Sequence, residues 1–135
     1  MSEKNTISRA FNNHFIELLN DLITIYPDNV EILTAKSSFE TFKKLNPSAI
    51  VKVWYNYVYK PYNEYIEAGN MDYFLNKNYQ DDLAYVNNSN EVLNMVERVK
   101  VPLRQLDGSN KDHTIEYLKN LNKLSLAYAT INGSL

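Results

Sequence analysis

Cysteine is absent from this chain of 135 residues, and glycine occurs only three times. Without cysteine there is no disulfide framework, no thiolate nucleophile and no cysteine-ligated metal, which fits a reducing compartment. Glycine-rich phosphate loops and Gly/Ser linkers are also missing. No apolar run reaches the roughly 20 residues that a membrane-spanning helix needs, and the polar start lacks the apolar stretch of a signal peptide. These absences predict an intracellular protein that does not enter a membrane.

The residues that are present predict one helical domain. The hydrophobic fraction of 44% excludes a disordered chain, and the length suits a single domain. Apolar residues recur every three or four positions almost throughout, which is typical of helices. No segment alternates as a strand between hairpin turns. We therefore predict an all-α, single-domain bundle of about five main helices over residues 1–135, with residues 1–5 and 132–135 frayed.

Proline, glycine and asparagine mark the predicted helix ends. Helices are predicted at residues 6–26, 30–45, 47–69, 87–106 and 110–131, with two short helical turns within 70–86. Asn29 or Asp28 is expected to cap the second helix and Asn46 the third, and Gly69 to end the third in a left-handed conformation. Pro61 and Pro102 fall inside predicted helices. Because an internal proline removes a hydrogen bond and collides with the preceding turn, we expect a kink or split at each.

Aromatic residues crowd into positions 54–65, where six of the twelve residues are Trp or Tyr. A helical projection places Val51, Tyr55, Val58, Tyr62 and Ile66 on one face, which predicts that this face packs in the core. One edge of Trp54, together with Tyr57 and Tyr59, is left over. Because Trp and Tyr are common anchors of protein interfaces, these three are the predicted interaction residues. Burial of the whole cluster is the alternative.

Charge is unevenly distributed although the net charge is only −2. Residues 61–97 hold one base against seven acids, and residues 98–135 hold six bases against three acids. The candidate basic patch consists of Arg98, Lys100, Arg104 and Lys111. The two regions could pair within the domain, dock between copies, or steer a charged partner. Nucleic-acid binding through this patch is an alternative function, although Lys60 is the one base near the aromatic cluster, where a stacking platform needs a basic groove.

Residue types for catalysis are scarce. The two histidines, His14 and His113, lie about a hundred positions apart. His14 has Glu17 three residues on, but a metal site in a helical bundle needs such elements on several helices. We predict packing or surface roles for His14 and exposure for His113. Asp81 and Asp82 form the one vicinal acidic pair, with no phosphate cradle near them. The sequence therefore predicts no catalytic residue, no metal and no cofactor.

Several segments together carry a resemblance. They are FNNHF (11–15), YPDN (26–29), TAKSSF (34–39), KKLNP (43–47), W-x-x-Y-V-x-x-P-Y (54–62), IEAGNMDYFLNKNYQDDL (66–83) and NLNKLSLAY (120–128). Over roughly residues 10–130 the chain resembles a family of small all-helical proteins of nucleocytoplasmic large DNA viruses, the giant viruses; Asn70 stands where that family favours an acid. The resemblance implies a viral origin, with host cytoplasm, viral factory or virion as the setting, and no established enzyme activity. We therefore expect a non-enzymatic structural or interaction protein that self-associates or binds another protein.

Overall fold

The computed structural model describes residues 3–76, 90–106 and 108–132, and every regular element in these ranges is helical. The predicted all-α class is confirmed. The elements are α1 (Glu3–Ile25), α2 (Val30–Leu45), α3 (Ala49–Trp54), the π-helical turn η1 (Tyr55–Tyr59), α4 (Lys60–Glu67), α5 (Met71–Asn76), α7 (Asn90–Leu103) and α8 (Gly108–Asn132). None of the described helices is long and apolar enough to cross a membrane.

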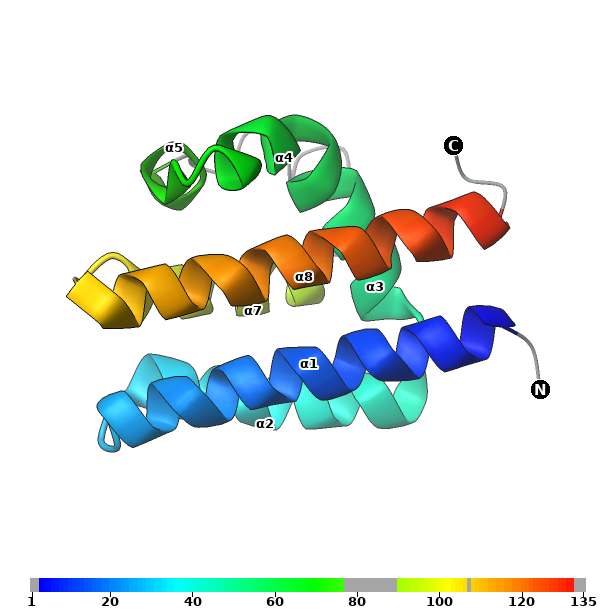
Figure 1. The fold of residues 1–135 in the computed structure, drawn as a ribbon. Helices are drawn as coiled ribbons and strands as arrows, with labels where there is room; N and C mark the ends of the chain where they lie inside the picture. The colour runs from blue at the N-terminus through cyan, green and yellow to red at the C-terminus, as the bar shows by residue number, and fades with distance from the viewer. Residues whose placement is uncertain (1–2, 77–89, 107, 133–135) are drawn as a thin grey trace.

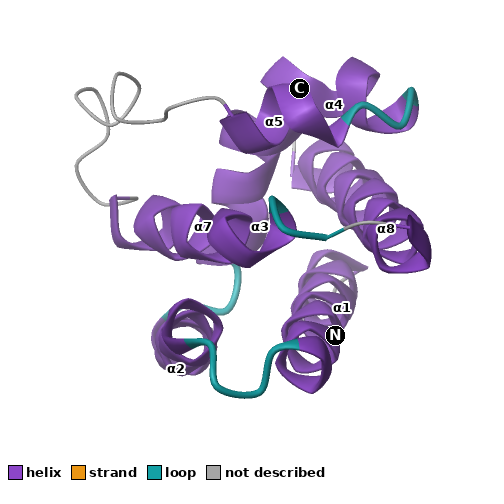
Figure 2. Ribbon diagram, turned by 90° about the vertical axis from the view of Figure 1, so that its left-hand side faces the viewer, coloured by secondary structure: helices purple, strands orange, loops and turns teal. Residues whose placement is uncertain are grey.

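Four long helices form the body of the molecule, with α8 lying along α1 and α7 lying along α2 (Figure 1). The short helix α3 contacts all four of them. Helices α4 and α5 lie on the side of α8 opposite to α1 (Figure 2). The core is centred on stacked and edge-on rings of Phe11, Phe15, Phe39 and Trp54. This arrangement leaves one face of α4 and α5 open to solvent.

The π-helical turn η1 follows from Pro61. Proline has no N–H, and its ring would collide with the carbonyl of Tyr57 four residues earlier in a regular α-helix. The N–H of Lys60 bonds to the carbonyl of Tyr55, five residues back, so the turn is widened by one residue. The predicted distortion at Pro61 is thus confirmed. Tyr55 and Val58 stay buried across it.

Two of the predicted helix ends are confirmed. The side chain of Asn29 caps α2 by accepting a hydrogen bond of 3.1 Å from the N–H of Ile32. After α4, Gly69 adopts a left-handed φ of 81°, which only glycine adopts without strain. The N–H of Asn70 then donates to the carbonyl of Tyr65 over 2.7 Å, and that of Gly69 to Ile66 over 3.0 Å. This is a Schellman turn, and it directs α5 back over α4.

Other predicted ends are wrong. Asn46 does not cap a third helix but ends α2, with its N–H bonded to Phe42, and α3 begins three residues later with Ser48 at its N-cap. Helix α7 ends at Leu103 rather than at residue 106, because the N–H groups of Gln105 and Leu106 bond three residues back, to Pro102 and Leu103, and no longer continue the α-helical pattern. Helix α1 begins at Glu3 and α8 runs from Gly108 to Asn132, so residues 3–5 and 132, predicted to be frayed, are helical. The predicted frayed positions 1–2 and 133–135 and the acidic pair at 81–82 lie outside the described residues.

Candidate functional site

Trp54, one of the three predicted interaction residues, belongs to the core. Its side chain is only 3% exposed, and its ring meets those of Phe11 and Phe15 edge-on, with centroids 5.9 Å apart in each case. The indole Nε1–H donates a buried hydrogen bond of 2.7 Å to Oδ1 of Asn122 on α8. The expectation of an exposed Trp54 edge is therefore wrong, because α3 packs against four helices and Trp54 lies among these contacts.

Tyr57 and Tyr59 are half-buried rather than exposed together. The ring of Tyr57 packs against the core. The ring of Tyr59 stacks on Tyr55 with centroids 5.2 Å apart, and the Lys60 ammonium lies 5.2 Å above the Tyr55 ring. The core face predicted from spacing is confirmed, since Val51, Tyr55, Val58, Tyr62 and Ile66 are all buried. Most of the aromatic surface of the π-helical turn is therefore covered by other residues of the same chain.

The exposed aromatic surface lies further along the chain, on α4 and α5. Tyr65 and Tyr73 stack with ring centroids 4.1 Å apart and an interplanar angle of 13°. Behind them, the buried ring of Tyr62 lies 5.7 Å from that of Tyr73. Tyr65 remains 38% exposed and Tyr73 48% exposed. We call Tyr62, Tyr65 and Tyr73 the tyrosine platform.

The platform is positioned by its backbone. The carbonyl of Tyr65 accepts a hydrogen bond in the Schellman turn at Gly69. Tyr65 therefore helps to close the turn that leads into α5, where Tyr73 lies. On the far side of α5, Met71 and Leu75 are buried in the core. The guanidinium of Arg104 donates to the carbonyl of Leu75 from Nε over 2.9 Å and from Nη2 over 2.7 Å. Helix α5 is therefore anchored at both ends of its short length.

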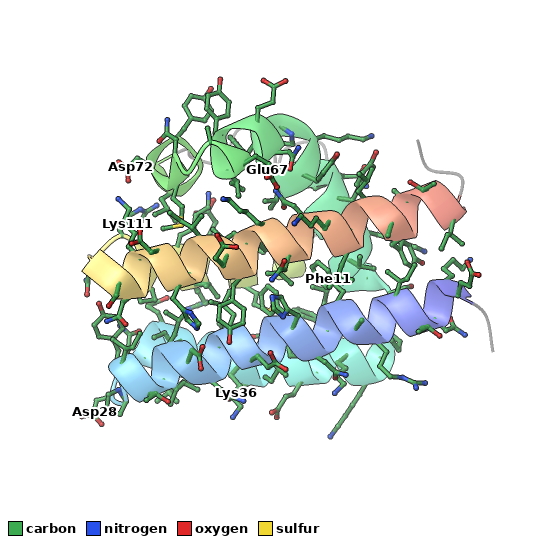
Figure 3. All side chains as sticks on the ribbon, viewed as in Figure 1. Phe11, Asp28, Lys36, Glu67, Asp72 and Lys111 are labelled. Carbon is green, nitrogen blue, oxygen red and sulfur yellow. The ribbon has the colours of Figure 1, made fainter. Side chains whose placement is uncertain are left out.

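Acidic side chains are exposed on the two helices that carry the platform. In the described residues of α4 and α5, Glu64, Glu67 and Asp72 are exposed, and Lys60 is the one base. Glu67 lies on α4 and Asp72 on α5, where Asp72 approaches Lys111 of α8 (Figure 3), with 3.6 Å between Nζ and Oδ1. This surface is thus tyrosine-rich and net negative, which continues the acidic middle region seen in the sequence.

The predicted basic patch is not assembled as a free cationic surface. Arg98 pairs with Glu31 on α2 over 3.2 Å. Arg104 donates hydrogen bonds to the carbonyl of Leu75, and Lys111 pairs with Asp72. The side chain of Lys100 is fully buried, so the prediction that Lys100 belongs to a surface patch is wrong. The stem of Lys100 packs among core residues while its ammonium reaches Glu97, at an Nζ–Oε1 distance of 3.4 Å. Three of the four patch residues, Arg98, Arg104 and Lys111, thus bond to groups on other helices of the chain.

Both histidines meet one tyrosine between α1 and α8, which sequence spacing did not reveal. The rings of His14 and His113 lie 4.7 and 5.2 Å from that of Tyr117. The Tyr117 hydroxyl donates to Oδ2 of Asp21 over 2.7 Å, and Nε2 of His113 lies 3.3 Å from the same oxygen. His113 is exposed, as predicted. Among the residues that the structure describes, no cluster of three or more His, Cys, Asp or Glu could hold a metal ion.

We expect Tyr117→Phe to lower the free energy of unfolding by about 1 kcal/mol at neutral pH, the typical value of one hydrogen bond. Burial and the bond to Asp21 raise the pKa of Tyr117 from 10.0 to about 12. The folded protein therefore holds this proton more tightly than the unfolded chain does, and stability is lost as the pH rises from 10 to 12. The stability difference between wild type and variant should shrink over this window.

Urea unfolding followed by circular dichroism across that pH range tests the expectation. Tyr59→Phe, which removes a hydroxyl from a half-buried ring on η1, is the matched control for the loss of a tyrosine hydroxyl. A difference between wild type and Tyr117→Phe that stays constant across the window would contradict the proposed bond to Asp21.

Comparisons of this chain with models of known protein families, with curated proteins and with solved structures give no match. The resemblance to giant-virus proteins stays a prediction. On the described surface, the stacked and half-exposed rings of the tyrosine platform are the feature from which a function can be proposed.

Proposed function

We propose that this protein is a non-enzymatic interaction protein and that the tyrosine platform binds an arginine-bearing basic segment of a partner protein. The observation that carries the proposal is the stacked, half-exposed pair of Tyr65 and Tyr73 on two helices that also expose three carboxylates. Through the resemblance, the proposed setting is a virion or viral factory.

The chemistry of the platform favours arginine over other partner groups. A guanidinium stacks on a tyrosine face through cation–π and planar contacts, and it can also pair with a neighbouring carboxylate in a fork. Glu64 and Glu67 supply such carboxylates on α4, whereas Asp72 on α5 already pairs with Lys111. Complementary charge speeds encounter and selects against acidic partners. Nucleic acid is disfavoured on this surface because its phosphates would meet like charge.

The platform is also largely prearranged. Tyrosine has few rotatable bonds, the rings of Tyr65 and Tyr73 are already stacked on each other, and the buried ring of Tyr62 contacts that of Tyr73 at a tilt of 55°. A partner therefore loses little free energy to ordering of this surface, which raises affinity for a given contact area. Tyr is enriched among the residues that dominate binding energy at interfaces.

The binding test uses three labelled peptides of equal length that alternate glycine with arginine, lysine or glutamate. Fluorescence anisotropy should give tighter binding for the arginine peptide than for the lysine peptide, and none for the glutamate peptide. Tyr65→Ala/Tyr73→Ala should weaken the arginine peptide by about tenfold, equivalent to about 1.4 kcal/mol. Glu64→Gln/Glu67→Gln should also weaken it and reduce its salt dependence.

Two controls separate stacking from general attraction. Tyr65→Leu/Tyr73→Leu keeps apolar area but removes the π faces, so it should also lose the preference for arginine over lysine. Tyr59→Ala, on η1 outside the platform, should leave the affinity unchanged. If binding follows net charge alone and ignores the platform variants, the proposal is wrong. A dimer in light scattering that the platform variants abolish would place a second copy there and overturn the basic segment as occupant.

A further inference from the structure

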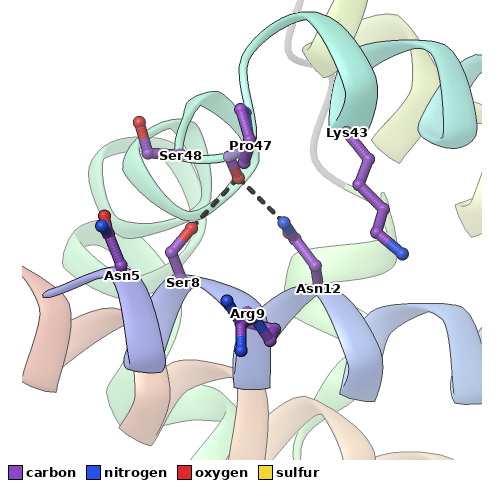
Figure 4. Close-up of a pocket in the computed structure, with 7 residues that line it drawn as sticks. All are labelled: Asn5, Ser8, Arg9, Asn12, Lys43, Pro47 and Ser48. Carbon is purple, nitrogen blue, oxygen red and sulfur yellow. Dashed lines mark hydrogen bonds between the residues drawn. The ribbon is translucent and has the colours of Figure 1, made fainter. Parts of the chain in front are cut away.

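A cleft lies between the N-terminal half of α1 and the connection from α2 to α3, on elements that contribute nothing to the tyrosine platform. Its volume is about 420 Å³. It is lined by Asn5, Ser8, Arg9, Asn12, Lys43, Pro47 and Ser48. Figure 4 shows the first four residues on α1, Lys43 on α2, and Pro47 and Ser48 at the corner where the chain turns into α3. The cleft thus joins parts of the chain that are distant in sequence.

The wall of the cleft is held in place by hydrogen bonds across it. Ser8 Oγ and Asn12 Nδ2 both donate to the carbonyl oxygen of Pro47, over 3.1 and 2.9 Å (Figure 4). Ser48 Oγ donates to Oδ1 of Asn46 over 3.2 Å. Because Asn12 is nearly fully buried and its amide is oriented by the Pro47 carbonyl, this corner cannot easily shift relative to α1. A ligand would meet a preformed surface.

The lining chemistry selects an anion. Arg9 and Lys43 supply two positive charges from two different helices, and no carboxylate is among the lining residues. Both cations line the cleft from exposed positions, one on α1 and one on α2. Arginine matches the oxygens of a phosphate in a fork, and lysine adds a compact point charge. Two cations together suit a group that carries close to two negative charges, as a phosphate monoester does at neutral pH.

The size of the cleft selects an organic phosphate over a bare ion. Pockets for small organic ligands span about 300–1,000 Å³, and this cleft falls within that range. Pro47 and the polar side chains of the wall would then face the organic part of the ligand. We infer that the cleft formed by α1 and the α2–α3 corner binds a small phosphate monoester, with Arg9 and Lys43 holding the phosphate.

The experiment titrates the folded full chain with glucose 6-phosphate, glycerol 3-phosphate and adenosine monophosphate, and with inorganic phosphate and citrate for comparison, at constant ionic strength. Amide shifts in ¹H–¹⁵N spectra report where each compound binds. At least one monoester should bind about tenfold more tightly than inorganic phosphate and shift amides of residues 5–12 and 43–48. Arg9→Gln and Lys43→Gln should each weaken it by about fivefold or more.

Lys123→Gln, which removes an exposed charge from α8, is the matched control and should leave the affinity unchanged. Arg9→Lys keeps the charge without the fork and should fall between wild type and Arg9→Gln. The inference is overturned if no monoester binds better than inorganic phosphate, if citrate binds as tightly, or if the charge-removing variants bind as wild type does. These outcomes are independent of peptide binding at the tyrosine platform.

Discussion

Trp54→Ala should lower the free energy of unfolding by about 3–5 kcal/mol, the range for removing a large buried aromatic side chain. The indole is 3% exposed, contacts Phe11 and Phe15, and lies at the meeting point of α3 with four other helices. Alanine would leave a cavity that this crowded centre can only partly refill. Since total stabilities of small domains are about 5–15 kcal/mol, the variant should melt far below wild type. Urea unfolding and thermal melting by circular dichroism measure the change.

A second variant separates the hydrogen bond from the packing. Trp54→Phe keeps an aromatic ring but removes the N–H that donates to Asn122 over 2.7 Å. The buried Asn122 amide would then lose this donor, at a cost of about 1–3 kcal/mol in addition to the smaller ring. Trp54→Phe combined with Asn122→Leu removes both partners, so it should cost less than the sum of the two single changes.

The surface control for Trp54 is Tyr65→Ala. Because the Tyr65 ring is 38% exposed, its removal should cost about 1 kcal/mol or less. If Trp54→Ala were equally mild, the indole would not be part of the core, and its role as an exposed anchor would have to be reconsidered.

The features that sequence reasoning predicted correctly are governed by local chemistry. Asn29 caps a helix because its own side chain bonds three residues on. Gly69 ends one because only glycine adopts its φ without strain. Pro61 distorts one because it has no N–H to donate. The buried face of Tyr55, Val58 and Tyr62 follows from helical periodicity. Each of these depends on residues within a few positions of one another.

The errors concern side chains whose surroundings come from distant parts of the chain. Trp54 flanks the apolar face in projection, but α3 is enclosed on several sides, so the flank is buried as well. Lys100 was expected at the surface from its charge, although its long apolar stem lets it lie in the core with its ammonium near Glu97. Nothing in the spacing of Tyr65 and Tyr73 shows that the turn at Gly69 will stack them. The meeting of His14 and His113 at Tyr117 likewise needs the packing of α8 along α1.

Lys100→Met should raise the free energy of unfolding by about 1–3 kcal/mol at neutral pH, in line with replacements of buried ionic groups by apolar ones. The Lys100 side chain is 0% exposed, and burial lowers its pKa from 10.5 to about 8 despite the opposing attraction of Glu97. The amine is therefore still charged at neutral pH inside the core. Methionine keeps an unbranched, flexible stem and removes this charge. Glu97 would lose the ammonium of Lys100 but remains partly solvated, so the cost of leaving the Glu97 carboxylate unpaired is small.

The pH dependence of the free energy of unfolding tests separately whether the buried charge of Lys100 destabilises the protein. Between pH 8 and 10.5 the folded protein has released the Lys100 proton while the unfolded chain still holds it. Stability rises with pH wherever the unfolded state binds more protons, so wild type should gain stability across this window. Lys100→Met cannot make this gain, and its advantage should shrink as the pH rises. Urea unfolding of both proteins at neutral pH and at both ends of the window measures the difference.

Glu97→Gln is the matched opposite change. It removes the carboxylate 3.4 Å from the ammonium but leaves the buried charge, so it should destabilise the protein by about 1–3 kcal/mol at neutral pH. In the Lys100→Met background the same substitution should have little effect, because no charge is left for Glu97 to stabilise. If Lys100→Met instead destabilises the protein at every pH, the ammonium contributes more through its contacts than its burial costs. Lys100 would then be a structural cation that the fold requires.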